Sequence, residues 1–183
     1  MGEPRFCVIL CGGKSSRFGR DKAVEPFLGE PSMTHFCFKR YSRIFSQVFV
    51  CAKSQKFSPP LPLIKDDFED FSPMGALYSA LKGFAGEKVF IVPADTPFVS
   101  EEAIRALWES RAEISLASDG EKTHNLCGFF SGDLAERALK FYRENNHKIG
   151  EFITSCDSEI LKFKDKAQFL NINYESDLEK VEN

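Results

Sequence analysis

The sequence predicts an α/β fold: a three-layer α/β/α sandwich built on a mainly parallel sheet. Two apolar runs, at 6–10 and within 88–93, lack the polar alternation of a half-exposed strand, and such runs are typical of strands covered on both faces. Predicted strands and helices alternate over the first half of the chain, which favours right-handed βαβ units. With 183 residues and 43% hydrophobic content, we expect one domain, residues 1–183, around one core.

The other elements follow from caps, prolines and apolar runs. Pro31 is expected to open a helix over 32–45, because proline is tolerated in a first helical turn. Ser100 is expected to cap a helix that begins at 101. The further predicted strands are 47–52, a short one that ends at Lys65, 113–117, 126–130 and 159–163; the further predicted helices are 73–84, 133–144, 148–155 and one from Glu175.

Composition excludes several classes of protein. The net charge of −3 argues against a nucleic-acid partner, because phosphate-backbone binding normally goes with a basic surface. No apolar run reaches the length of a membrane span. The six cysteines form no C-x-x-C pair and no signal peptide precedes them, so we expect reduced thiols in a cytoplasmic protein.

The segment after the first strand has the composition of a polyphosphate-binding loop. Gly12 and Gly13 follow the strand directly, at the carboxyl end where parallel sheets bind ligands. Glycines let backbone N–H groups approach an anion closely. The next nine residues hold one acid, Asp21, and four cations: Lys14, Arg17, Arg20 and Lys22. Neither the Walker pattern nor the dinucleotide fingerprint matches this loop.

Residues 10–22 instead match, at every fixed position, the pattern Leu-x-Gly-Gly-x-Ser-x-Arg-x-Gly-x-Asp-Lys. The segment closely resembles the signature loop of the molybdenum cofactor guanylyltransferases, within the sugar-phosphate-type nucleotidyltransferases. Further motifs follow in family order as far as Leu178. The resemblance implies a Rossmann-like nucleotidyltransferase fold whose N-terminal half binds the nucleotide and whose C-terminal half binds the pterin. It also implies a reaction of Mg-GTP with the molybdopterin cofactor that yields the guanine dinucleotide form and pyrophosphate.

The loop is expected to hold the nucleotide. By resemblance, Arg17 and Lys22 bind the triphosphate, where charge-assisted hydrogen bonds stabilise the leaving pyrophosphate, and both are expected to be catalytic. Cys11 replaces the usual alanine of the family, a small change. The residues expected to border the nucleotide here are Leu10, Cys11, Gly12, Gly13 and Lys22.

Asp95 follows the strand within 88–93. A carboxylate just past a buried strand must be solvated, paired or metal-bound, and Mg²⁺ at phosphate sites takes one or two carboxylates together with phosphate oxygens. The Ala-Asp-x-Pro motif of the family implies that Asp95 holds Mg²⁺, contacts the nucleotide and is catalytic. The alternative is a cap for the turn that follows.

Two further strands end in residues expected at the nucleotide. Lys53 stands where the family typically carries an asparagine, and it is expected to reach a phosphate or ribose oxygen. Asp66 matches the family's nucleotide-contacting aspartate by its spacing to residues 72–75, with Asp67 as the alternative. A solvated acidic loop over 66–70 is an equally weighted interpretation.

The second half of the chain carries the expected pterin side. His124 lies in a segment that resembles the family's Asp-Gly turn and following strand, although a satisfied strand histidine fits it equally well. Asn171 and Asn173 resemble the closing Asn-Ile-Asn segment of the family. By itself, asparagine before a helix is more often a cap.

A phosphate attacking GTP needs no strong general base, since its second pKa is near ~6. Catalysis can therefore consist of positioning and charge neutralisation. The family also implies contacts with an upstream pterin-loading enzyme and with molybdoenzyme maturation proteins. Alternative functions are a cytidylyltransferase, a sugar-phosphate nucleotidyltransferase, or a nucleotide-binding regulatory module without turnover.

Overall fold

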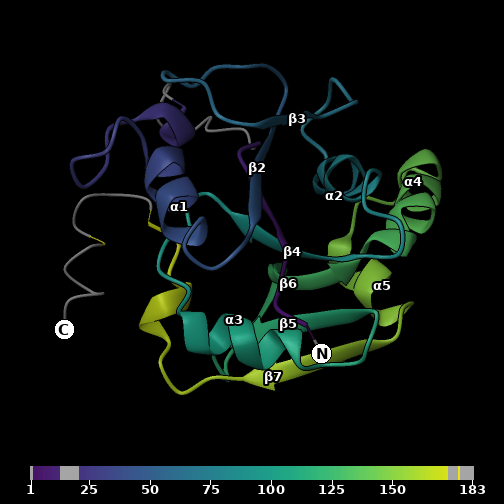
Figure 1. Ribbon diagram of the computed structural model, residues 1–183. Helices are drawn as coiled ribbons and strands as arrows, with labels where there is room; N and C mark the ends of the chain where they lie inside the picture. Colours follow the sequence, from purple (N-terminus) through teal and green to yellow (C-terminus); the bar gives the residue numbers. More distant parts are fainter. Residues whose placement is uncertain (1, 13–20, 173–176, 178–183) are drawn as a thin grey trace.

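A computed structural model describes residues 2–12, 21–172 and 177. Its strands form a seven-stranded sheet in the order β3-β2-β1-β4-β6-β5-β7 (Figure 1). β6 runs antiparallel to both of its neighbours, and the other pairings are parallel. The predicted mainly parallel sheet is therefore confirmed. The strands are β1 (Phe6–Leu10), β2 (Gln47–Ala52), β3 (Leu63–Lys65), β4 (Lys88–Pro93), β5 (Ile114–Ser118), β6 (Thr123–Ser131) and β7 (Ser158–Lys162).

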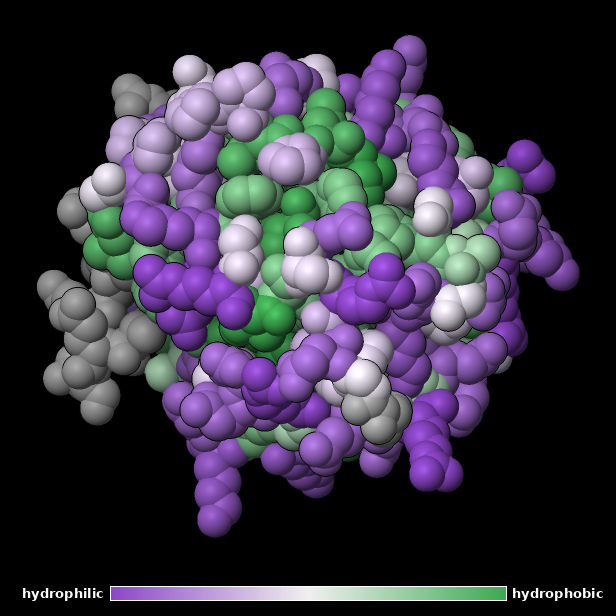
Figure 2. All heavy atoms as spheres, in the orientation of Figure 1, coloured by the Kyte–Doolittle hydropathy of each residue, from purple (hydrophilic) through white to green (hydrophobic). Residues whose placement is uncertain are grey.

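Helices cover both faces of the sheet. α1 (Met33–Tyr41) and α3 (Glu101–Trp108) pack on one face, and α2 (Pro73–Leu81), α4 (Ala135–Arg143) and α5 (Ile149–Thr154) pack on the other (Figure 1). This arrangement confirms the predicted three-layer sandwich. Figure 2 shows apolar side chains gathered over β2 and β3 within a largely hydrophilic surface.

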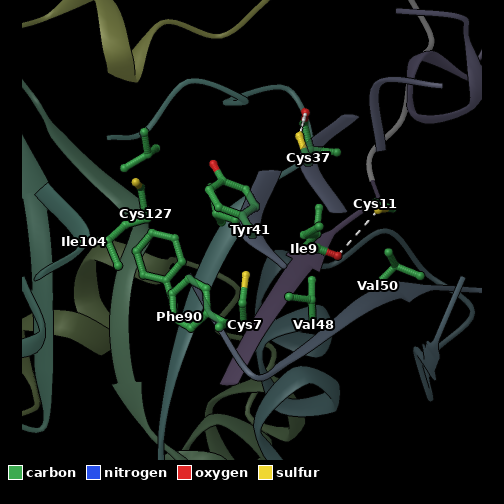
Figure 3. Close-up of a cluster of buried hydrophobic side chains, with 14 of the residues drawn as sticks. Cys7, Ile9, Cys11, Cys37, Tyr41, Val48, Val50, Phe90, Ile104 and Cys127 are labelled. Atoms are coloured by element: carbon green, nitrogen blue, oxygen red, sulfur yellow. Dashed lines mark hydrogen bonds between the residues drawn. The ribbon is translucent and has the colours of Figure 1, made fainter. Parts of the chain in front are cut away.

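The two cores explain the unbroken apolar runs. In β1, Cys7 and Ile9 point into the core beneath α1 and α3, whereas Val8 and Leu10 point into the core beneath α2 and α4. All five residues of β1 are buried. Figure 3 shows Cys7, Tyr41 and Phe90 of the first core side by side. A strand with two covered faces gains from apolar residues at every position, so the run carries no alternation.

Serine caps begin three of the helices. Ser32, Ser72 and Ser100 each accept a hydrogen bond from the backbone N–H three residues on, which satisfies an otherwise unpaired donor. The prediction for Ser100 is confirmed. The prediction for Pro31 is wrong, because the extended Ser32 is the cap and the proline lies before it.

Several predicted boundaries shift. α1 ends at Tyr41 rather than 45, because tight turns through residues 42–44 carry the chain back to the core. β6 begins at Thr123, three residues before the prediction, because the turn after β5 lets Ser118 pair with Thr123. Two single-turn 3₁₀ helices, η1 (Lys22–Val24) and η3 (Ala167–Phe169), were not predicted, since one turn leaves no periodic pattern. The helix predicted from Glu175 lies outside the described residues, apart from residue 177.

The register of β1 brings the strand ends to one level. Leu10 pairs with Cys51 of β2 and with Pro93 of β4. Hydrogen bonds continue past the strands, from the N–H of Ala94 to the carbonyl of Leu10 at 3.0 Å and from the N–H of Asp66 to the carbonyl of Ala52 at 2.9 Å. The residues after β1, β2, β3 and β4 therefore leave the sheet along one edge.

The six cysteines are unpaired, as predicted. Burial is the largest effect on the thiols of Cys11, Cys51 and Cys127, and the pKa of each rises to about 12. These thiols stay protonated at neutral pH, so they act as small apolar core residues. Within residues 2–12 and 21–172, no helix is both long and apolar enough to cross a membrane.

A substitution of Gly128 tests the packing of the antiparallel strand β6 against β5. A Cβ at this position would lie 1.9 Å from the carbonyl oxygen of Ser115 on β5, so Gly128→Ala must displace one strand. We expect a loss of about 2 kcal/mol or more in the free energy of unfolding. Urea unfolding measures it, with Gly83→Ala as the matched control, since a Cβ there meets no described atom within 4 Å. Equal stability of the two variants would contradict the described β5–β6 pairing.

Candidate functional site

The carboxyl edge of β1, β2, β3 and β4 gathers most of the residues predicted at the nucleotide. Gly12, Lys53, Asp66 and Asp95 each lie one or two residues past a strand of this group. Ligands of parallel α/β sheets bind at this edge. Gly13, Arg17 and Asn173 lie outside the described residues, so their roles stay predictions.

The two residues before Gly12 are tied into the sheet by backbone hydrogen bonds, whereas the described residues leave space beside Gly12. The carbonyl of Leu10 accepts from Ala94, and the N–H of Cys11 donates to Cys51 at 2.9 Å, so the sheet uses both groups. A Cβ at Gly12 would meet no described atom within 4 Å, and its φ lies outside the left-handed region. The described residues therefore do not themselves require glycine at this position.

The turn that carries Asp95 is held from beneath by α1. The Cys37 thiol donates to the carbonyl of Ala94 at 3.3 Å, and the Tyr41 hydroxyl donates to the carbonyl of Thr96 at 3.1 Å. Both side chains are fully buried, so they fix the turn against the core.

Asp95 and Lys22 lie in each other's electrostatic field. Burial raises the pKa of the Asp95 carboxyl above its ordinary value, while Lys22 and a hydrogen bond from the Thr96 hydroxyl act in the opposite direction. Lys22 is the first residue of η1, which follows the glycine-rich loop in the chain. The structure thus places two of the three residues predicted to be catalytic within electrostatic range of each other.

The C-terminal segment reaches the same turn. The N–H of Ile172 donates to the carbonyl of Asp95 at 2.7 Å, and the Thr96 hydroxyl donates to Oδ1 of Asn171 at 3.2 Å. Ile172 is buried against Phe27. A residue predicted on the pterin side, Asn171, therefore lies beside the residue predicted to bind the metal and the nucleotide.

The His124 ring contacts Asp119 and Phe169 within the protein. Backbone N–H donors hold the pKa of the Asp119 carboxyl at about 2, so Asp119 is ionised and accepts from Nε2 of His124 at 3.0 Å. Burial lowers the pKa of His124. Its ring stacks on Phe169, with 5.1 Å between centroids, and Phe169 precedes Asn171 by two residues. A direct pterin contact of His124 stays a prediction.

Lys53 points toward the loop after β3. Its ammonium donates to Oδ2 of Asp66 at 2.6 Å, to the carbonyl of Asp70 at 2.6 Å and to the carbonyl of Phe68. A lysine has three donors, and this loop takes all three. A phosphate or ribose contact of Lys53 stays a prediction, and the described contacts tie β2 to the 66–70 loop.

Asp66 and Asp67 have different surroundings. Asp66 is buried, and its Oδ1 also accepts from the Ser79 hydroxyl at 3.2 Å and from the N–H of Phe68. Asp67 is exposed and pairs with Lys82 at 2.5 Å. The solvated-loop interpretation therefore fits Asp67 and does not fit Asp66, whose nucleotide contact stays a prediction.

Two residues of the site were missed from the sequence. Thr96 joins Asp95 to Asn171, and Lys56 contacts both the carbonyl of Cys11 and the carboxylate of Asp21. A second lysine three positions after Lys53 was a visible signal. Its partners could not be read from the sequence, because they lie 45 and 35 positions away.

Known proteins resemble this chain over nearly its full length. The family model of the MobA-like NTP transferase domain matches residues 7–159. The molybdenum cofactor guanylyltransferase of Campylobacter jejuni is 40% identical over 95% of this chain and 93% of its own. The Helicobacter pylori protein of the same name is 27% identical over 94% of this chain and 89% of its own.

Solved structures show the same fold. A protein of Aquifex aeolicus aligns with a TM-score of 0.78 and 28% identity over 94% of this chain and 95% of its own. Molybdopterin-guanine dinucleotide biosynthesis protein A of Archaeoglobus fulgidus aligns with a TM-score of 0.78 and 18% identity over 96% of both chains. The latter likeness concerns the fold alone.

The Lys53–Asp66 pair gives a stability prediction. Lys53→Ala leaves the Asp66 carboxylate buried without its counter-charge, so we expect a loss of about 2 kcal/mol in the free energy of unfolding. Lys82→Ala removes a more exposed partner of Asp67 and should cost less than about 0.5 kcal/mol. Chemical denaturation compares the two, and equal losses would show that the Lys53 pair is not specially stabilising.

Proposed function

Because this chain belongs to the MobA-like NTP transferase family, we propose that it transfers GMP from GTP to the molybdopterin-bound molybdenum cofactor and releases pyrophosphate. The names of its relatives support the reaction. The observation that carries the proposal is that Asn171 contacts the turn at Asp95, while the charge of Lys22 acts on the Asp95 carboxyl. A transferase that joins two phosphate-bearing molecules needs its nucleotide side and its acceptor side at one point.

The chemistry is a displacement at the α-phosphorus of GTP. A phosphate oxygen of the pterin forms the new bond to that phosphorus, the bond from the α-phosphorus to the bridging oxygen breaks, and pyrophosphate leaves with the electron pair. Lys22, with Arg17 as predicted from the motif, neutralises the growing negative charge on the leaving group. The attacking phosphate is largely ionised at neutral pH, so no side chain is needed as a strong base.

Asp95 fits a magnesium ligand. It is a half-buried carboxylate at the ligand edge; the Thr96 hydroxyl contacts it and also contacts the amide oxygen of Asn171. Among residues 2–12, 21–172 and 177, no group of three or more His, Cys, Asp or Glu could hold a metal. Asp95 and phosphate oxygens would hold Mg²⁺, because one or two carboxylates with phosphate oxygens are the ligands it takes at phosphate sites. When bound, it would neutralise phosphate charge.

Nucleotide titration tests the proposal. Calorimetry with GTP, CTP and ATP, each with Mg²⁺ and with a chelator, should show tightest binding of Mg-GTP, and pyrophosphate release should then require the pterin cofactor. A preference for CTP would contradict the guanylyl assignment and favour the cytidylyl alternative. Nucleotide binding without pterin-dependent turnover would favour the regulatory module.

Asp95 and Lys22 give the mutational prediction. Asp95→Asn removes the charge with little change in shape, and Lys22→Gln removes a cation at the triphosphate. Each should lower the rate of pyrophosphate release by about 10²-fold or more. Glu101→Gln and Lys39→Gln are the charge-matched controls, since Glu101 pairs with Arg105 and Lys39 pairs with Glu30. Wild-type rates in both site variants would contradict the assignment.

A further inference from the structure

We propose that Lys56 is a positioning residue, which sets the place of the Lys22 ammonium by holding Asp21, the cap of η1. The inference rests on the proposed function in one respect, namely that Lys22 binds the triphosphate. It assigns a role to a residue that lies outside the signature loop and three positions beyond Lys53.

Lys56 contacts the chain on both sides of the glycine-rich loop. Its ammonium donates to the carbonyl of Cys11 at 3.0 Å and forms an ion pair with Oδ2 of Asp21. The other carboxylate oxygen, Oδ1 of Asp21, accepts from the N–H of Ala23 at 3.1 Å and so caps η1. One carboxylate thus connects the lysine to the helical turn.

η1 depends on such outside contacts. A 3₁₀ turn of three residues has poor hydrogen-bond geometry and little stability of its own. The Thr34 hydroxyl of α1 donates to the carbonyl of Ala23 at 2.7 Å, which fixes one side of the turn. Asp21 and Lys56 fix its beginning. Lys22 is the first residue of this turn, so the place of its backbone, from which its charge acts on Asp95, follows from the cap.

The contacts of Lys56 favour positioning over direct phosphate binding. Its charge is compensated by Asp21, and a second donor is used by a backbone carbonyl. Both side chains of the pair are partly exposed, 26% for Lys56 and 44% for Asp21. Ion pairs this exposed contribute little to global stability. The effect of removing Lys56 should therefore appear in ligand binding and not in the unfolding of the protein.

The experiment measures binding of two probes, GTP and inorganic tripolyphosphate, by calorimetry in the presence of a chelator. Lys56→Gln should weaken both about tenfold, because small displacements of a binding group have large effects. Lys56→Arg should restore binding to within about threefold, since arginine can pair with the same carboxylate. Lys39→Gln, which breaks another lysine–carboxylate pair, is the control and should bind both probes as wild type does.

The decisive arm repeats Lys56→Gln in a Lys22→Ala background. If Lys56 acts through Lys22, the second substitution should cause no further loss of binding affinity.

Asp21→Asn keeps a capping oxygen but removes the charge. It should therefore weaken binding as much as Lys56→Gln does, and the effects of the two substitutions should not add. The melting temperature of each single variant should stay within about 2 °C of wild type.

Two results would overturn the inference. One is unchanged probe binding in Lys56→Gln; the other is an equal loss in the Lys22→Ala background, which would mean that Lys56 binds phosphate directly. Tripolyphosphate carries no base, so its arm reports on Lys56 even if GTP is the wrong nucleotide. If the wild-type protein shows no preference for GTP over other nucleotides, the proposed function is contradicted. The result for Lys56 with tripolyphosphate would still stand.

Discussion

The site depends on the position of β1 between two parallel neighbours. β1 is buried on both faces and hydrogen-bonded along both edges, so its backbone has one rigid exit. Because Leu10 pairs with both Cys51 and Pro93, the loops that follow three strands begin at one level. A slip of one residue would turn every side chain of the strand to the wrong core. Packing of the two cores therefore fixes the geometry of the ligand edge.

Some of the lysines at this edge form ion pairs within the protein. β2 lies between β1 and β3, so the connection after β2 can contact the loops on both sides. Lys53 contacts the loop after β3, and Lys56 contacts the segment after β1. Each lysine is matched by an aspartate. In the structure both lysines connect neighbouring loops. The sequence assigned Lys53 to the ligand, which stays a prediction, and gave no role to Lys56.

The C-terminal segment completes the edge from the far end of the chain. Residues 168–172 are held by the Gln168 side chain, which accepts from the N–H of Ser100, and by the bond from Ile172 to Asp95. His124 supports the same segment through its stacking on Phe169. The turn at Asp95 thus has α1 beneath it and Asn171 beside it, and Lys22 lies within electrostatic range. The residues predicted for the two substrates therefore lie near one turn.

The sequence by itself determined the fold class, the central strands, the cap at Ser100 and the family, because apolar runs, capping residues and signature motifs are local patterns. It could not give the true cap at Ser32, the early start of β6 or the partners of Lys53 and Lys56. Those depended on tertiary structure. A long side chain takes whichever acceptor the fold brings within reach, and for Lys56 that acceptor, Asp21, is 35 positions away. Local periodicity carries no information about a contact at that separation.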